Sequence, residues 1–127
     1  EIENSAMSMD LLPTIADYCK VAMLPEGVEG MSLRGLMKND ESIRDTLYWN
    51  MRDGRWVVRH GPWKLLFRPR DDTKDYPALD PEKDRFFLAN LDIDRSESRN
   101  LIEEHPEKAK ELMTVYSGWE HAFPVEP

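Results

Sequence analysis

The sequence has little cysteine, no long hydrophobic run and no excess of positive charge. Its single cysteine, Cys19, excludes an intrachain disulfide framework. No run approaches the roughly 18 apolar residues of a membrane-spanning helix, so no segment is predicted to cross a bilayer. Seventeen Lys and Arg against 25 Asp and Glu give a formal charge of −8. This balance argues against a nucleic-acid coat protein or a polybasic membrane-surface module.

The start of the sequence also lacks familiar signals. Residues 1–4, EIEN, contain neither the charged nor the apolar region of a signal peptide, and there is no initiator Met. We therefore expect a processed or excised chain. With 127 residues, the sequence has room for one ordinary domain or for a piece of a larger protein. Its 40% hydrophobic residues place it outside the disordered range.

A helix is predicted near the N-terminus, over residues 9–21. Ser8 or Asp10 is suited to cap it, because a side-chain oxygen can accept a hydrogen bond from a free backbone N–H of the first turn. Apolar side chains recur at helical spacing and predict one buried stripe, formed by Leu11, Leu12, Ile15, Ala16 and Cys19. Residues 24–27, LPEG, predict the turn that ends this helix, and residues 32–37 predict a short helical turn.

From residue 46 the apolar period changes from about 3.6 to 2, which predicts strands. Glycines at Asp53-Gly54 and His60-Gly61 predict the turns between the first three. The expected strands are residues 46–51, 55–59, 63–67 and 86–91, with an exposed loop over 69–82. A last helix is predicted to start at His105-Pro106, with an apolar stripe of Ala109, Leu112, Met113, Tyr116 and Trp119. The predicted fold is α+β, a small antiparallel sheet of about four strands with the C-terminal helix packed on one face.

The first helix has no evident partner in this sheet. We interpret it as the tail of a preceding, larger α/β domain, and we place the boundary near residues 38–41, KNDE. The chain is thus predicted to contain two parts, residues 1–40 and residues 41–127.

A basic stretch runs from Arg52 to Arg70. It contains five Arg and one Lys against one Asp, about +5, so the remainder of the chain carries about −13. Arginines at alternate strand positions beside Trp56 and Trp63 are suited to bind sulfate, phosphate or carboxylate oxygens. The same pattern also arises when arginines simply form the solvated face of a hairpin. The net negative charge of the whole chain disfavours single-stranded nucleic acid as a partner.

A partial calcium-loop pattern lies before the last helix, at Asp92, Asp94, Ser96 and Glu103. Glu97 stands where that loop needs Gly, so a turn leading into the helix is the favoured interpretation. The three histidines have no second ligand at metal-binding spacing, and His60 is the one suited to a site. Cys19 lies on the apolar stripe and is predicted to be a core thiol. By chemistry alone, the sequence shows no complete active site.

Five segments, in order, are similar to type I sulfatases. Residues 8–15 and 24–33 resemble the family patterns S-x-D-L-x-P-T and P-x-G-x-x-G-x-S-L. Residues 47–50 and 59–65 resemble its strands L-Y-W-E and V-R-x-G-x-W-K-L, and residues 88–101 resemble L-Y-N-L-x-x-D-P-x-E-x-x-N-L. In this chain the segments read SMDLLPTI, LPEGVEGMSL, LYWN, RHGPWKL and LANLDIDRSESRNL. Each is weak alone, but together they cover nearly the whole chain.

The resemblance implies an alkaline-phosphatase-like fold and hydrolysis of sulfate esters. In this family the nucleophile is a formylglycine made within a C/S-x-P-x-R motif, beside a divalent cation that is usually calcium. Cys19 is followed by Lys20-Val21-Ala22-Met23, which does not match that motif. No catalytic residue, metal ligand or cofactor is therefore assigned to this chain. We expect the C-terminal portion of a sulfatase or a related phosphonate-ester hydrolase, inactive alone, with residues 1–40 ending the catalytic domain and 41–127 forming the C-terminal subdomain.

In such enzymes the C-terminal subdomain covers one side of the substrate pocket. The residues predicted to contact substrate are Trp49, Asn50, Arg52, His60 and Arg70. Asn50 stands where many relatives have an acid, and Arg95 replaces the usual Pro of the last turn. The implied partners are the N-terminal catalytic domain of the same polypeptide and a sulfated small molecule or glycan, with no nucleic acid or membrane.

The implied location is periplasmic, secreted or lysosomal. The fragment hypothesis also predicts that the first helix exposes an apolar face. Two alternatives stay open: a module in which the basic hairpin binds an anionic glycan, and a structural domain that docks on a separate catalytic chain.

Overall fold

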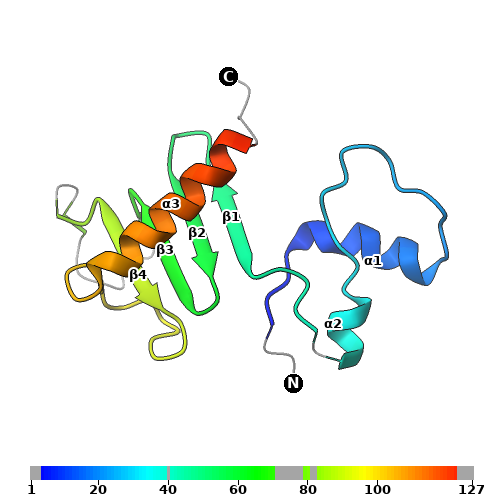
Figure 1. Cartoon of the computed structure of the whole chain (residues 1–127), viewed down its shortest axis with the longest axis horizontal. Helices are drawn as coiled ribbons and strands as arrows, with labels where there is room; N and C mark the ends of the chain where they lie inside the picture. Colours follow the sequence, from blue (N-terminus) through cyan, green and yellow to red (C-terminus); the bar gives the residue numbers. More distant parts are fainter. Residues whose placement is uncertain (1–3, 40, 71–78, 81–82, 123–127) are drawn as a thin grey trace. The chain divides into compact units, whose positions relative to one another are not determined.

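The computed structural model describes residues 4–39, 41–70, 79–80 and 83–122 (Figure 1). The chain divides into two compact units, Glu1–Asp45 and Thr46–Pro127. The division lies a few residues beyond the boundary proposed from the sequence. Most of the loop predicted over residues 69–82 lies outside the described residues.

The first unit begins with a short 3-10 turn, η1 (Ser8–Asp10), followed by helix α1 (Leu11–Tyr18). The predicted helix over residues 9–21 is thus too long at its C-terminal end. Lys20 has a φ of 56°, and the N–H groups of Lys20 and Val21 donate to the carbonyls of Asp17 and Ala16. This is the Schellman pattern of helix ends, with Lys where Gly is usual. Helix α2 (Arg34–Asn39) follows, close to the predicted helical turn.

Asp10 ties the N-terminal turn to the segment that precedes α2. Its carboxylate is fully buried and accepts hydrogen bonds from the N–H groups of Met7 (2.8 Å) and Met31 (2.9 Å). It also forms an ion pair with the Arg44 guanidinium at 2.6 Å. Burial alone would raise the pKa of Asp10, but the Met31 and Met7 N–H groups and the Arg44 charge outweigh it and lower the pKa.

Two further contacts hold the same segment against α1. The Thr14 hydroxyl accepts a hydrogen bond from the Leu33 N–H at 2.9 Å and donates one to the Asp10 carbonyl at 2.6 Å. Gly30 passes so close to η1 that an added Cβ would lie 2.0 Å from the Met9 carbonyl oxygen. Residues 30–33 therefore lie directly on the helix, and Gly is required at position 30 by space.

The second unit is a four-stranded antiparallel sheet in chain order. Its strands are β1 (Thr46–Asn50), β2 (Trp56–His60), β3 (Trp63–Phe67) and β4 (Phe86–Asn90). The turns before β2 and β3 contain Gly54 and Gly61 at φ values of 77° and 56°, which favour glycine. The sheet predicted from the alternation is confirmed.

Helix α3 (Pro106–Ala122) lies across one face of this sheet (Figure 1). We call this the helix face. It carries the buried side chains Val58, Leu65 and Leu88, which pack with Leu112 and Ala109 of α3. Aromatic rings complete the core, because Trp56 stacks on Tyr116 at 3.9 Å and Tyr48 on Trp119 at 4.7 Å between ring centroids. The predicted apolar stripe of the last helix is confirmed.

The Asp10 ion pair gives the first testable prediction. Asp10→Asn removes the charge that faces Arg44, and we expect it to destabilise the first unit by about 3 kcal/mol. Because all four Trp residues lie between positions 49 and 119, Trp fluorescence does not report on this unit. Amide hydrogen exchange of Met31 and Leu33 does, and it should accelerate roughly a hundredfold.

The matched control is Asp17→Asn, since Asp17 is an exposed carboxylate bonded to Ser32 and Arg34. We expect Asp17→Asn to change the hydrogen exchange of Met31 and Leu33 little, because exposed ion pairs contribute little to stability. Because the pKa of Asp10 is lowered, its contribution is present above about pH 4 and is lost as the pH falls through the lowered value. Equal protection of Met31 in both variants would contradict this role.

Candidate functional site

Trp49 and Asn50 lie side by side on β1 but on opposite faces of the sheet. Asn50 is paired in register with Trp56, so it shares the helix face, and Trp49 is paired with Val57 on the other face. The Tyr116 hydroxyl of α3 donates a hydrogen bond to Asn50 Oδ1. Asn50 is exposed to solvent, and because its Oδ1 accepts this hydrogen bond, the Nδ2 amide group remains as the donor of the side chain.

Tyr116 therefore holds the orientation of the Asn50 amide. Its ring is fixed by stacking on Trp56, and its hydroxyl lies 3.3 Å from the Glu120 carboxylate. Burial and the nearby negative charge of Glu120 raise the pKa of Tyr116. The hydroxyl consequently remains protonated, and remains a donor to Asn50, over the whole neutral range.

His60 lies at the opposite end of the sheet from Arg52 and Arg70. Its Nδ1 is 2.8 Å from the Thr46 hydroxyl, at the start of β1, whereas Arg52 follows the end of β1 and Arg70 follows the end of β3. Five-residue strands separate their two ends by roughly 13 Å. The structure thus brings Asn50 and Arg52 to one end of the sheet and leaves His60 at the other.

The arginines of the basic stretch do not lie beside its tryptophans. Trp56 and Trp63 belong to the helix face, where Trp63 contacts His105 of the last loop. Arg59 alternates to the opposite face and donates to the Gly61 carbonyl, and Arg55 pairs with Asp53 at 2.6 Å. Arg59 and the two tryptophans are close in the sequence but lie on opposite faces of the sheet, because side chains alternate along a strand.

The residues of the partial calcium pattern form the turn that the sequence favoured. Asp94 Oδ2 accepts hydrogen bonds from the N–H groups of Ser98 and Arg99. Glu97 adopts the left-handed conformation itself, at a φ of 53°, and its carboxylate is bonded to Lys64 Nζ at 2.6 and 2.8 Å. Among the residues that the structure describes, no three His, Cys, Asp or Glu side chains are grouped to hold a metal ion.

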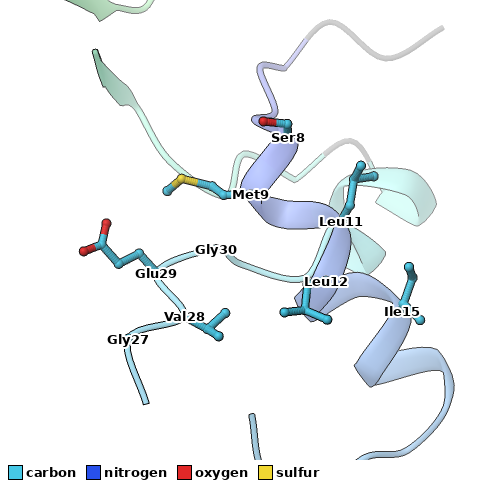
Figure 2. A pocket seen from close by; sticks show the side chains of 9 residues that line it. All are labelled: Ser8, Met9, Leu11, Leu12, Ile15, Gly27, Val28, Glu29 and Gly30. Carbon is cyan, nitrogen blue, oxygen red and sulfur yellow. The ribbon is translucent and has the colours of Figure 1, made fainter. Parts of the chain in front are cut away.

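Helix α1 presents its apolar side chains to solvent. Leu11, Leu12 and Ile15 are 58%, 51% and 60% exposed, and they line an open groove of about 570 Å³ with Met9 and Val28 (Figure 2). Cys19 is also exposed. Of the predicted buried stripe, only Ala16 is buried, on the side of the helix that also buries Pro13 and Thr14. The prediction is wrong for Leu11, Leu12 and Ile15, and for Cys19 as a core thiol. The exposed apolar face expected of a fragment is present.

Comparison with known proteins identifies the relatives of this chain. No protein-family model matches it. A protein of Formosa agariphila named Sulfatase is 28% identical over 107 residues, which span 78% of this chain and 19% of that protein. This chain is similar to the C-terminal portion of a sulfatase. The resemblance predicted from the sequence is confirmed.

Two solved structures share the fold of this sulfatase-like chain. One, BT33336S-sulf, comes from work on glycosaminoglycan metabolism by Bacteroides thetaiotaomicron, with a TM-score of 0.63 and 22% identity. The other, BT4656 in complex with its substrate D-glucosamine-2-N,6-O-disulfate, has a TM-score of 0.60 and 20% identity. Each covers 88% of this chain, which spans only 24% and 23% of them. The α+β fold predicted from the sequence is the fold of these neighbours.

One contact of the sulfatase-like chain could not be predicted from its sequence. The contact between Asn50 and Tyr116 joins positions 66 apart, and no local pattern announces it. In the described part of the chain, no helix has both the length and the apolar character needed to cross a membrane.

The Tyr116 hydroxyl gives the second testable prediction. Tyr116→Phe keeps the ring stacked on Trp56 but removes the donor to Asn50, so we expect a loss of about 1 kcal/mol in the free energy of unfolding. Tyr116→Ala also removes the ring, and should cost about 3–5 kcal/mol. Denaturant titration followed by Trp fluorescence measures both. Equal losses of unfolding free energy in the two variants would show that packing of the Tyr116 ring does not stabilise the unit.

The raised pKa of Tyr116 fixes the direction of its pH dependence. The contribution to stability is complete below about pH 10, the ordinary tyrosine value, and is lost as the pH rises through the raised value. Tyr116→Phe should remove this alkaline decline.

Proposed function

We propose that this chain is the C-terminal part of a sulfatase-like hydrolase that cleaves sulfate esters in the intact enzyme. The observation that carries the proposal is the ordered set of sulfatase segments on a sheet and helix of the sulfatase C-terminal fold. The chain spans about a fifth of the length of the curated relative, so the activity is proposed for a longer protein. In that protein, residues 46–122 would form one side of the substrate pocket.

The exposed apolar face of α1 supports a missing catalytic domain. Leu11, Leu12 and Ile15 are 51–60% exposed, so covering the rest of each would contribute about 1 kcal/mol or slightly more, and a free domain gains nothing by exposing them together. We propose that their partner is the rest of the catalytic domain, in the same polypeptide. The docking of this chain on a separate catalytic chain is the alternative, and it uses the same surface.

Formylglycine and a divalent cation would supply the nucleophile and the charge neutralisation in the intact enzyme. The sequence has no C/S-x-P-x-R motif, so no residue here is assigned to that chemistry. What this chain would supply is recognition of the substrate. Trp49, Asn50, Arg52, His60 and Arg70 remain the proposed contacts, and the geometry favours Asn50 with Arg52, which share one end of the sheet.

Asn50 is suited to a sulfated substrate because it is a positioned donor. Tyr116 occupies its Oδ1, so the Nδ2 hydrogens are directed to a ligand, and sulfate oxygens only accept hydrogen bonds. An acid at this position, as in many relatives, can only accept hydrogen bonds, so Asn50 offers a substrate a donor that those relatives lack here. BT4656 acts on a glucosamine with two sulfate groups, which supports a sulfated sugar as the substrate class proposed here.

The third prediction concerns the chain alone. The purified 127-residue chain should hydrolyse no aryl sulfate, because its sequence lacks the nucleophile motif. The intact polypeptide that contains it should hydrolyse a sulfated sugar. Cys19→Ser should change neither result, since Cys19 is an exposed thiol outside that motif. Hydrolysis by the purified chain that disappears in Cys19→Ser would overturn the proposal.

The fourth prediction tests Asn50 in the intact enzyme. Asn50→Asp still accepts the Tyr116 hydrogen bond, so the fold is kept, but it replaces two donors by a negative charge. We expect kcat/KM for a sulfated sugar to fall about tenfold, equivalent to about 1.4 kcal/mol. The matched control is Asn39→Asp, at an exposed amide on α2. Unchanged kinetics in Asn50→Asp would remove Asn50 from the substrate contacts.

A further inference from the structure

One end of the sheet places arginines on neighbouring strands. Trp56, Phe67 and Phe86 are partners in register, and the next residue outward on each strand is Arg55, Arg68 and Arg85. The ladder continues through them, because the Arg68 N–H donates to the Arg85 carbonyl at 2.8 Å. Arg52 lies in the turn before Arg55, at the same end. Neighbouring strands are about 4.8 Å apart, so these positions are close together.

Three of these arginines carry charges that the described residues do not neutralise. Arg55 is paired with Asp53, but within residues 4–39, 41–70, 79–80 and 83–122 no carboxylate lies within 4.0 Å of the guanidinium of Arg52, Arg68 or Arg85. We call these three residues the arginine rim. All three are exposed. Like charges on paired strand positions disfavour the fold, so the rim is explained by binding and not by stability.

Asp84, which precedes Arg85 in the sequence, already has hydrogen-bond partners. Asp84 accepts hydrogen bonds from the Asp80 N–H at 2.9 Å and from the Asn100 amide at 3.2 Å. The backbone of the rim is also fixed. Arg68 has a left-handed φ of 52° within the ladder, and the Arg85 guanidinium lies over the Phe67 ring at 5.4 Å from its centroid. The rim is therefore a preorganised surface for an anion.

We propose that the arginine rim binds a polymeric anionic glycan, through its sulfate or carboxylate groups. The occupant rests on the proposed function, and the chemistry fits independently, because guanidinium forks match the oxygens of both groups. A single-stranded nucleic acid would also need aromatic platforms for its bases. The nearby rings of Trp56, Phe67 and Phe86 contact one another, and Trp56 also stacks on Tyr116 of α3, so these rings pack within the unit.

The arginine rim shares only Arg52 with the contacts predicted from the sequence. Arg68 and Arg85 were not among them, and Arg85 lies outside the basic stretch altogether. A polymer held at the rim would keep a long substrate chain on the enzyme between cleavage events, with Arg52 shared between the rim and the proposed substrate contact at Asn50. This function requires several weak contacts along one chain and gains strength with the length of the polymer.

The experiment measures binding of fluorescent heparin to the purified 127-residue chain at low salt. Its rim variant is Arg52→Gln, Arg68→Asn and Arg85→Gln together, with Asn at position 68 because it tolerates the left-handed backbone. The control variant removes three positive charges elsewhere, through Arg95→Gln, Arg99→Gln and Lys110→Gln. Arg95 and Arg99 lie in the loop after β4, at the other end of the sheet. Far-ultraviolet circular dichroism verifies that both variants are folded.

We expect the rim variant to lose roughly tenfold in affinity, as three exposed charge contacts should give. The control should bind as the parent chain does, and binding should weaken as salt is added. No binding by the parent chain, or equal losses in both variants, would overturn the proposal. Displacement by poly-glutamate or an oligonucleotide at the same charge concentration as heparin would overturn the choice of a glycan. Because the isolated chain is expected to be inactive, this result is independent of sulfate-ester hydrolysis by the intact enzyme.

Discussion

The register of the four strands is the constraint on which the second unit depends. Pairing Phe67 with both Trp56 and Phe86 places three aromatic rings on one face, where Tyr116 of α3 stacks on Trp56. The same register places Asn50 within reach of the Tyr116 hydroxyl. A shift of one residue in β2 would turn Trp56 to the opposite face. The stacking of Trp56 on Tyr116 would be lost, and with it the support for the Tyr116 hydrogen bond to Asn50. Core packing and the proposed substrate contact are therefore set by one geometric choice.

Most of this sheet is predictable from the sequence, because its information is local. Alternating apolar residues such as Trp63, Leu65 and Phe67, bounded by a glycine turn, are typical of a β-strand and fit few other structures. The end of α1 is harder to predict from the sequence. Lys20 terminates that helix in a left-handed conformation that usually requires Gly, so nothing in the residue type announces the stop. The helix is closed there by the hydrogen bonds from the Lys20 and Val21 N–H groups to the Asp17 and Ala16 carbonyls.

The candidate site is predictable only in part, because it depends on contacts between distant positions. Sequence patterns place Asn50 and Arg52 on one strand end, but they do not show that Tyr116 orients Asn50 or that Arg85 lies beside Arg68. The apolar stripe of α1 illustrates a second limit. Helical spacing reveals that Leu11 and Ile15 share a face, but it does not reveal whether the partner of that face belongs to the same chain.

Gly30 has a consequence for genetics. Any side chain there collides with the Met9 carbonyl, which would push residues 30–33 away from α1 and pull the Met31 N–H off Asp10. The buried Asp10 carboxylate would then lose a hydrogen-bond donor through a substitution at a residue that has no side chain of its own. A missense change at Gly30 should therefore lower the accumulation of the protein, and a genetic screen would score it together with lesions that remove the protein entirely.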